Sequence, residues 1–165
     1  MVSPNNSIQL DLAYIAEEDR VLITLYKDQD HFDWWLTRRM GIALVSAWLE
    51  KLEAIGLPQI AIAQLQNPNR NLPLEHELSL EFDGPKSKKV STNPNPNAML
   101  IQEVSISVSQ VDCLLLIKAE GQSTRLNLTR KESHAFLEMV AAKARHADWI
   151  NKPNWPIWLG VSRPA

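Results

Sequence analysis

The sequence predicts an α+β fold of two tandem, duplicated strand-strand-strand-helix units, in which antiparallel sheets pack against two helices with pseudo-twofold symmetry. Three observations predict this class. Several stretches alternate apolar and polar residues, two stretches carry apolar residues at helical spacing, and the same order of elements recurs at a constant offset of 92 residues. A chain of 165 residues, 45% of them hydrophobic, can bury the core of a single domain.

The first repeat covers about residues 8–56 and contains three predicted strands followed by a helix. The strands are the alternating or β-branched stretches Ile8 to Tyr14, Arg20 to Tyr26 and His31 to Leu36. From Arg38 onward, apolar residues recur at spacings of three and four, which predicts an amphipathic helix. Gly56 and Pro58 are expected to end this helix.

The second repeat covers about residues 100–147 and shows the same events in the same order. Leu100 to Val108 mostly alternates, Cys113 to Ile117 is apolar, and a helical stripe follows. At the offset of 92 residues, the turn into the second helix matches the turn into the first: Leu36-Thr37-Arg38-Arg39 aligns with Leu128-Thr129-Arg130-Lys131. The ungapped offset, the order of elements and the shared Leu-Thr-Arg-basic turn favour a duplication over chance.

Two segments lie outside the repeats. In the connecting segment, about residues 57–99, Leu74 to Phe82 alternates strictly and predicts a strand, and a polar loop follows. The tail, residues 148–165, combines tryptophans with prolines and is predicted to be extended. Its tryptophans are too apolar to remain in water, so they either pack on the chain itself or contact a second subunit or protein partner. These residues are Trp149, Trp155 and Trp158.

The repeated turn is the most informative candidate site. Thr37 and Thr129 are placed to cap the two helices, and Glu132 completes a capping box with Thr129. Cations in a first helical turn are disfavoured by the helix dipole, so their presence requires another explanation. The cations at the two turns are Arg38, Arg39, Arg130 and Lys131.

Two explanations stay open for these basic residues. One is an anion site, because cations and free backbone N–H groups at a helix start attract phosphate, carboxylate or nucleic acid. The other is internal ion pairing with carboxylates such as Asp30 and Asp33. Trp34 and Trp35 precede the first turn, and one of them must face away from the core. That ring either stacks on nucleic acid bases or is covered by the tail or a partner.

The composition argues against several classes of protein. The net charge of −2 and the pI near 6.1 give no whole-molecule attraction to nucleic acid or anionic membranes. No stretch approaches the roughly 18 apolar residues of a membrane span. Cys113 is the single cysteine and cannot form an internal disulfide, so a cytoplasmic location is expected.

No catalytic residue can be nominated, because the common hydrolase and phosphate-loop motifs do not occur. His76 lies between Glu75 and Glu77 and would point away from both on a strand. The sequence implies no cofactor and no metal site, because candidate metal ligands occur only in pairs. These pairs are His31 with Asp33, His134 with Glu138, and His146 with Asp148.

Repeated units of several antiparallel strands followed by one helix resemble, in the order of elements, the Whirly-type regulators that bind single-stranded nucleic acid. The resemblance covers most of the chain and implies binding through a basic sheet face. Residues 1–55 hold five Lys and Arg against nine Asp and Glu, and residues 100–165 hold eight against six. The first repeat therefore fits this interpretation poorly.

The leading functional hypothesis is a non-catalytic binding or interaction protein, with a protein partner or a homodimer formed through Trp and tail residues. The alternative is a single-stranded nucleic-acid-binding protein, which would use the helix-start cations together with Lys86, Lys88 and Lys89. The third hypothesis is an enzyme whose site is assembled from residues distant in sequence.

Overall fold

Six strands follow one another in sequence order across one sheet in the part of the chain that the structure describes. The computed structural model describes residues 8–27, 30–55, 71–81, 97–149 and 155–160. The strands are β1 (Gln9–Ile15), β2 (Arg20–Lys27), β3 (Asp30–Thr37), β4 (Met99–Val108), β5 (Asp112–Ala119) and β6 (Gln122–Thr129). The predicted α+β class is confirmed.

The sheet is mixed, which corrects the prediction of antiparallel sheets. The groups β1-β2-β3 and β4-β5-β6 are each antiparallel. Between them, β3 and β4 run parallel and pair at Trp34↔Met99 and Trp35↔Leu100. Two helices and their connections separate these two strands in sequence, and a crossover of that length can return the chain to start a strand in the same direction.

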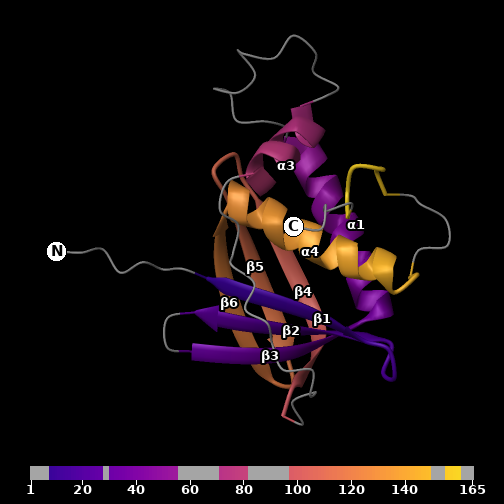
Figure 1. Ribbon diagram of the computed structural model, residues 1–165. Coiled ribbons are helices and arrows are strands. Elements are labelled where there is room, and N and C mark those ends of the chain that lie inside the picture. The colour runs from indigo at the N-terminus through magenta and orange to yellow at the C-terminus, as the bar shows by residue number, and fades with distance from the viewer. Residues whose placement is uncertain (1–7, 28–29, 56–70, 82–96, 150–154, 161–165) are drawn as a thin grey trace.

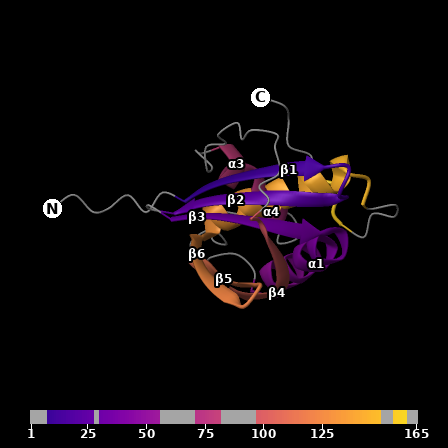
Figure 2. The same cartoon turned by 90° about the horizontal axis from the view of Figure 1, so that it is seen from below.

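Two long helices pack against the concave side of the sheet (Figure 1). Helix α1 (Arg38–Ile55) contacts β3 and β4, whereas α4 (Arg130–His146) contacts α1, β1, β5 and β6. One helix reaches strands from both ends of the sheet because the sheet curls, and Figure 2 shows β1–β3 and β4–β6 as the two sides of that curve. None of the helices in the described segments is long and apolar enough to cross a membrane.

A shared core joins the two helices and both strand groups. Trp48 of α1 and Phe136 of α4 lie in its centre with ring centroids 5.3 Å apart. The indole nitrogen of Trp48 donates to the Ser133 hydroxyl at 2.9 Å, which satisfies both buried polar groups. The predicted alternation is confirmed on β1, where Leu10 and Leu12 are buried. On β5 the buried residues also alternate, at Cys113, Leu115 and Ile117, whereas β2 is buried at every position from Val21 to Leu25.

The two predicted helix caps are confirmed. The backbone N–H of Glu132 donates to the Thr129 hydroxyl at 3.1 Å, and that hydroxyl donates to the Glu132 carboxylate at 3.2 Å. Thr129 therefore caps α4, whereas the Glu132 carboxylate accepts from the Thr129 hydroxyl and not from the backbone N–H that the predicted capping box requires. At the start of α1, the N–H of Met40 donates to the Thr37 hydroxyl at 3.3 Å.

The predicted strand Leu74 to Phe82 is wrong, because residues Asn71–Glu81 form helix α3. Pro73 is compatible with the first turn of a helix, where its missing N–H is not needed. The Ser79 hydroxyl donates to the backbone oxygen of Glu75, one helical turn earlier, at 2.7 Å. The alternating pattern is misleading because polar contacts to α4 hold α3 in place. The periodicity of a short sequence does not reveal contacts with a distant helix.

The other expectations for the connecting segment, including its polar loop with Lys86, Lys88 and Lys89, fall outside the described residues.

The described part of the tail, Trp155 to Gly160, makes turns and is neither extended nor helical. It packs on α4: the Arg145 guanidinium donates to the backbone oxygens of Leu159 at 2.7 Å and Pro156 at 3.1 Å.

We expect Gly41→Ala to destabilise the protein, although alanine is the better helix former by about 1 kcal/mol. A Cβ atom at Gly41 would lie 2.7 Å from the ring of Trp149. That ring is buried, and its indole nitrogen is held by Asp19 at 2.7 Å, so it cannot move away freely. Overpacking of this kind costs about 1–3 kcal/mol.

Urea denaturation followed by circular dichroism measures this change. Glu50→Ala, at an exposed position of the same helix, is the control and should alter the free energy of unfolding by less than about 0.5 kcal/mol. A Gly41→Ala protein more stable than the wild type would contradict the close packing of Trp149 on α1.

Candidate functional site

The basic residue at the start of α4 is buried and paired. Arg130 donates from Nε and Nη2 to the two carboxylate oxygens of Glu75, at 2.9 Å each. Its Nη1 donates to the backbone oxygen of Ser109 at 3.1 Å. Such a bidentate pair satisfies both groups, so Glu75 occupies the place that an anionic ligand of Arg130 would take. The carboxylate comes from α3, not from a neighbouring turn.

The other helix-start cations are not brought together with Arg130. Arg38 is exposed, and its Nη2 donates to the backbone oxygens of Asp148 at 3.3 Å and Trp149 at 3.2 Å. Arg39 is exposed and Lys131 is half-buried. Anion or nucleic acid binding by these residues stays a prediction.

The tryptophans of β3 face opposite sides, as their succession in a strand requires. Trp34 is buried in the core and stacks on Phe32, with ring centroids 5.5 Å apart. Trp35 faces the other side and is half-buried. Base stacking at this site would therefore depend on Trp35 alone.

The tail tryptophans pack mainly on their own chain. Trp149 and Trp155 are buried, and the Trp155 indole nitrogen donates to the Ser46 hydroxyl at 3.2 Å. Trp158 is half-buried, with its ring centroid 4.9 Å from that of His76. Self-packing is thus the arrangement of Trp149 and Trp155, and a partner contact of Trp158 stays a prediction.

A row of polar side chains, here called the polar chain, continues from Arg130 into the interior between α3 and α4. His134 Nε2 lies 3.3 Å from Glu75 Oε1. The Nδ1 atoms of His134 and His76 are 2.9 Å apart, and His76 Nε2 lies 2.8 Å from Glu138 Oε2. The exposed fractions of His134, His76 and Glu138 are only 0%, 2% and 3%, so the chain is an interior structure.

Helical spacing explains how these residues meet. Arg130, His134 and Glu138 follow one another at intervals of four on α4 and therefore share one face of that helix. The neighbouring residues Glu75 and His76 come from α3. The sequence pattern shows the pairing of His134 with Glu138, but the missed helix conceals the contribution of His76.

The electrostatics of the polar chain favour a charged Glu75 beside a neutral His134. Burial alone would raise the pKa of Glu75, but the approach of His134 and the hydrogen bonds from Arg130 outweigh it, so this pKa lies below its usual value. Burial lowers the pKa of His134, and Glu75 only partly offsets this effect. Among the described residues, His134 Nε2 is the one buried side-chain nitrogen or oxygen without a hydrogen-bond partner.

The end of the tail also contacts the polar chain. The backbone N–H of Gly160 donates to Glu138 Oε2 at 2.7 Å, the same oxygen that contacts His76. Gly160 has a φ of 75°, and a Cβ atom there would lie 2.9 Å from the backbone of Ala141. Only glycine allows this close approach without strain.

The described residues include no group of three or more His, Cys, Asp or Glu arranged to hold a metal ion. In the polar chain, His76 directs its two nitrogens at different partners, His134 and Glu138. His31 and Asp33 remain a pair, 3.1 Å apart.

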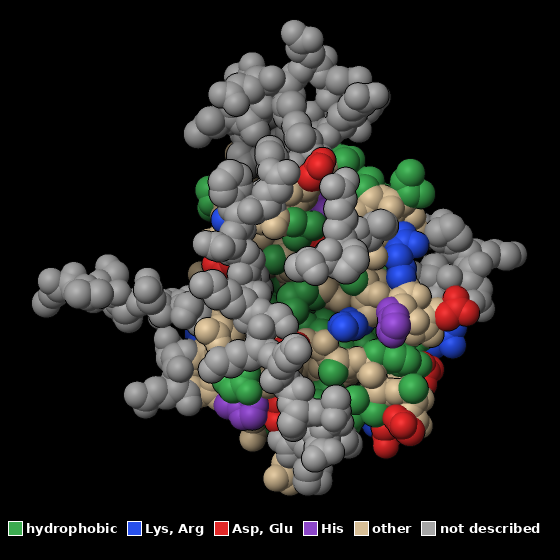
Figure 3. Space-filling model, in the orientation of Figure 1, with side chains coloured by type: hydrophobic (Ala, Val, Ile, Leu, Met, Phe, Trp, Pro, Cys, Tyr) green, Lys and Arg blue, Asp and Glu red, His purple; other side chains and the backbone are tan. Residues whose placement is uncertain are grey.

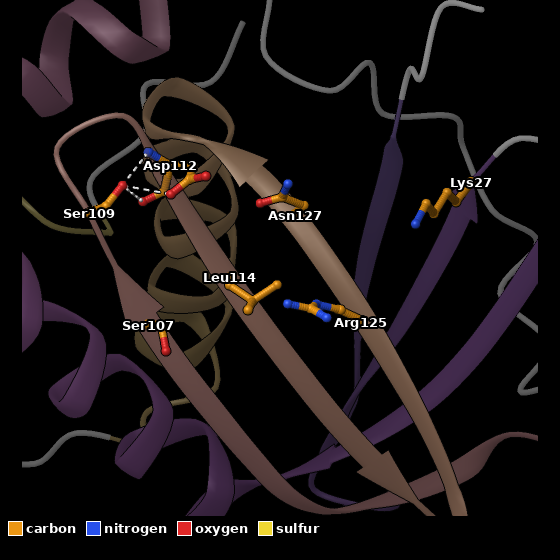
Figure 4. Close-up of a pocket in the computed structure, with 7 residues that line it drawn as sticks. All are labelled: Lys27, Ser107, Ser109, Asp112, Leu114, Arg125 and Asn127. Atoms are coloured by element: carbon orange, nitrogen blue, oxygen red, sulfur yellow. Dashed lines mark hydrogen bonds between the residues drawn. The ribbon is translucent and has the colours of Figure 1, made fainter.

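A separate cavity of about 520 Å³ lies on the outer face of the second strand group. Ser107, Leu114 and Asn127 form a row across β4, β5 and β6 on the face opposite the core. Figure 4 shows Arg125 beside this row and Lys27 extending toward it from β2. The cavity, here called the outer pocket, is lined by Lys27, Ser107, Ser109, Asp112, Leu114, Arg125 and Asn127.

The outer pocket has two cations and one carboxylate. The Asp112 carboxylate accepts from the Ser109 hydroxyl at 2.6 Å, and that hydroxyl also accepts from the N–H of Asp112 at 3.0 Å. Within the described residues, neither Lys27 nor Arg125 makes a side-chain hydrogen bond or ion pair. The pocket can therefore offer both cations to an anionic ligand.

The outer pocket is absent from the sequence-based predictions. The signal that could have found it is the alternation of Arg125 and Asn127 with the buried Leu126 and Leu128. Only the folded sheet brings these two polar residues together with Lys27 and Asp112 in one pocket.

Comparisons with known proteins add no relative: no protein family, curated protein or solved structure is significantly similar to this chain.

We expect Arg130→Met to lower the free energy of unfolding by about 3–5 kcal/mol, because it leaves the carboxylate of Glu75 buried without its partner. The double variant Arg130→Met with Glu75→Leu should recover most of that loss, since it removes both charges together. Urea denaturation of the single and double variants gives the coupling energy. Additive effects of the two substitutions would contradict a strong pair.

Proposed function

We propose that this chain is a non-catalytic binding protein, whose outer pocket receives an anionic group of its ligand or partner. The observation that carries this proposal is the placement of Lys27 and Arg125 in one pocket, with no carboxylate partner for either among the residues that the structure describes. Cations aligned in this way attract an anion and can donate hydrogen bonds to it.

The lining of the outer pocket supports binding through a few directed contacts. Asn127 and Ser107 add neutral hydrogen-bonding groups, and Leu114 gives the centre of the row an apolar surface. Binding sites commonly combine an apolar base with a small number of convergent polar groups. Ser109 and Asp112 hydrogen-bond to each other, so Asp112 is restrained and its repulsion of an anion is reduced.

The charge distribution supports a local site. On the face shown in Figure 3, cationic and anionic side chains are interspersed over the described part of the surface. The net charge of −2 likewise provides no long-range attraction for anions. Affinity would therefore come from direct contacts in the outer pocket.

Single-stranded nucleic acid is the second candidate ligand, because the outer pocket lies on an open strand surface that carries Arg125. A nucleic acid backbone would place successive phosphates along this face. The resemblance in element order to Whirly-type proteins points to the same use of a sheet. The affinity for such a ligand would fall steeply as salt concentration rises.

We also propose that the two halves of the chain arose by duplication. With an offset of 92 residues, the bounds of β2 match those of β5, those of β3 match β6, and the start of α1 matches that of α4. The parallel pairing of β3 with β4 supports a pseudo-twofold axis that runs along the strands of the curled sheet, because rotation about such an axis keeps the direction of each strand. Rotation about an axis perpendicular to the sheet would reverse the strands of the second repeat and make β3 and β4 antiparallel. A cytoplasmic location and homodimer formation remain proposals from the sequence.

Arg125→Ala should weaken the binding of an anionic probe by about 10- to 150-fold, because a hydrogen bond to a charged group is worth about 1.5–3 kcal/mol. The probes are a fluorescein-labelled hexaglutamate peptide and a fluorescein-labelled single-stranded deoxythymidine oligonucleotide, each titrated with the full chain. Fluorescence anisotropy reports the dissociation constants, and preference for one probe separates the two candidate ligands.

Lys51→Ala is the matched control, because it removes an exposed cation from α1 and should leave both dissociation constants unchanged. The proposal fails if Arg125→Ala and Lys27→Ala bind both probes as tightly as the wild type. It also fails if neither probe, nor inorganic phosphate, shifts the NMR amide signals of Arg125 and Asn127.

A further inference from the structure

The polar chain between α3 and α4 is costly to bury, and the proposed binding function makes no use of it. Moving charged side chains out of water costs several kcal/mol per ion, which apolar residues of similar volume would avoid. The polar chain links α3 to α4 and, through Glu138, also holds Gly160. These contacts point to a role in controlling how α3 and the tail attach to the rest of the protein.

The two histidines determine how many protons the closed arrangement accepts. Their Nδ1 atoms are 2.9 Å apart, and a hydrogen bond at this distance contains one hydrogen, donated by one ring and accepted by the other. A charged imidazole carries hydrogen on both nitrogens. The contact between His76 and His134 therefore tolerates one charged ring but not two.

Among the described residues, the charged groups that face this pair come from α3 and α4. Glu138 of α4 faces His76, while Glu75 of α3 and Arg130 of α4 face His134. The tail contributes the Trp158 ring and the N–H of Gly160, which are uncharged. Glu75 and Glu138 can stabilise one positive charge on the histidine pair, whereas the charge of Arg130 opposes a second positive charge there.

We propose that His76 and His134 form an acid-sensitive latch, which holds α3 and the Trp158–Gly160 segment on α4 at neutral pH and releases them when both rings become charged. If both rings were charged, the two Nδ1 atoms would each carry a hydrogen, and two N–H groups and two positive charges would repel each other. Separation of the rings removes this repulsion and breaks the link between α3 and α4. The face of α4 that carries His134 and Glu138 then becomes accessible.

Acid favours the open state because proton uptake accompanies opening. A histidine in water has a pKa of about 6.5, whereas burial lowers the pKa of His134 in the closed state. Above about pH 6.5 both states leave this ring neutral, so the closed state keeps its full stability. As the pH falls from about 6.5 through the lower closed-state pKa, the open state binds more protons and gains population.

The size of the effect follows from the number of protons taken up. One additional proton bound on opening raises the opening equilibrium constant by up to about tenfold per pH unit. Glu75 acts in a different range, because its pKa is lowered below its usual value near 4.5 and its contribution is lost only in stronger acid. His134 thus controls the range immediately below about pH 6.5.

Amide hydrogen exchange of the full chain, measured by mass spectrometry at about pH 7.5, 6.5 and 5.5 and corrected for the intrinsic pH dependence of exchange, tests the latch. We expect protection of the amides in α3 (Asn71–Glu81) to fall by up to about tenfold per pH unit below about pH 6.5. Protection of the amides in β5 should stay constant. Unchanged protection of α3 down to about pH 5.5 overturns the proposal.

Substitutions separate the latch from general acid sensitivity. His134→Gln removes one titrating ring and should abolish the pH dependence of α3 protection in this range. His146→Gln removes an exposed histidine from the same helix and should leave the dependence as in the wild type. If both variants keep the wild-type dependence, the proposal is wrong.

A measurement on the wild type keeps the test valid if His134→Gln does not fold. NMR of the imidazole signals follows protonation of His134 while the amide signals report on α3. We expect His134 to become charged over the same pH interval in which α3 loses protection. Protonation of His134 with α3 still protected, or loss of protection with His134 still neutral, contradicts the latch.

Discussion

The burial of α4 on nearly every side is the constraint on which the rest of the fold depends. Its apolar residues face the curled sheet and α1, with Phe136 packed against Trp48. Its polar face, with Arg130, His134 and Glu138, is also buried and needs partners that a sheet of apolar side chains does not offer. Helix α3 provides these partners, and the tail closes the remaining side. The curl of the sheet, the position of α3 and the path of the tail are therefore consequences of one helix.

The local structure could be predicted from the sequence wherever one face of an element meets the apolar core. The alternation of Leu10 and Leu12 with polar residues predicts β1, and the three- and four-residue spacing of Leu44, Trp48 and Leu52 predicts α1. The caps at Thr37 and Thr129 were also predictable, because a cap depends on residues within one turn. These features arise from short-range rules of geometry and burial.

The features that were missed depend on contacts between distant residues. Helix α3 has polar residues on its buried side, so its pattern does not show the apolar stripe by which a helix is recognised. A strand would turn His76 away from Glu75 and Glu77, whereas the helix directs it at α4. Arg130 was a candidate for ligand binding, but its partner Glu75 lies 55 residues away in the sequence. By contrast, the sequence does not single out Arg125, because exposed polar residues are common on strands and only the folded sheet gathers them into a pocket.

The narrow parallel junction between β3 and β4 has a consequence for how the chain folds. Within each strand group, hairpins pair residues that are close in sequence, as Ile15 does with Arg20. The junction pairs Trp34 with Met99, so its formation requires closure of a far longer loop. Contacts of large sequence separation form slowly because chain entropy is lost before they are made. We therefore expect the two strand groups to assemble first and their joining to limit the folding rate, with Trp34 and Met99 acquiring native contacts late.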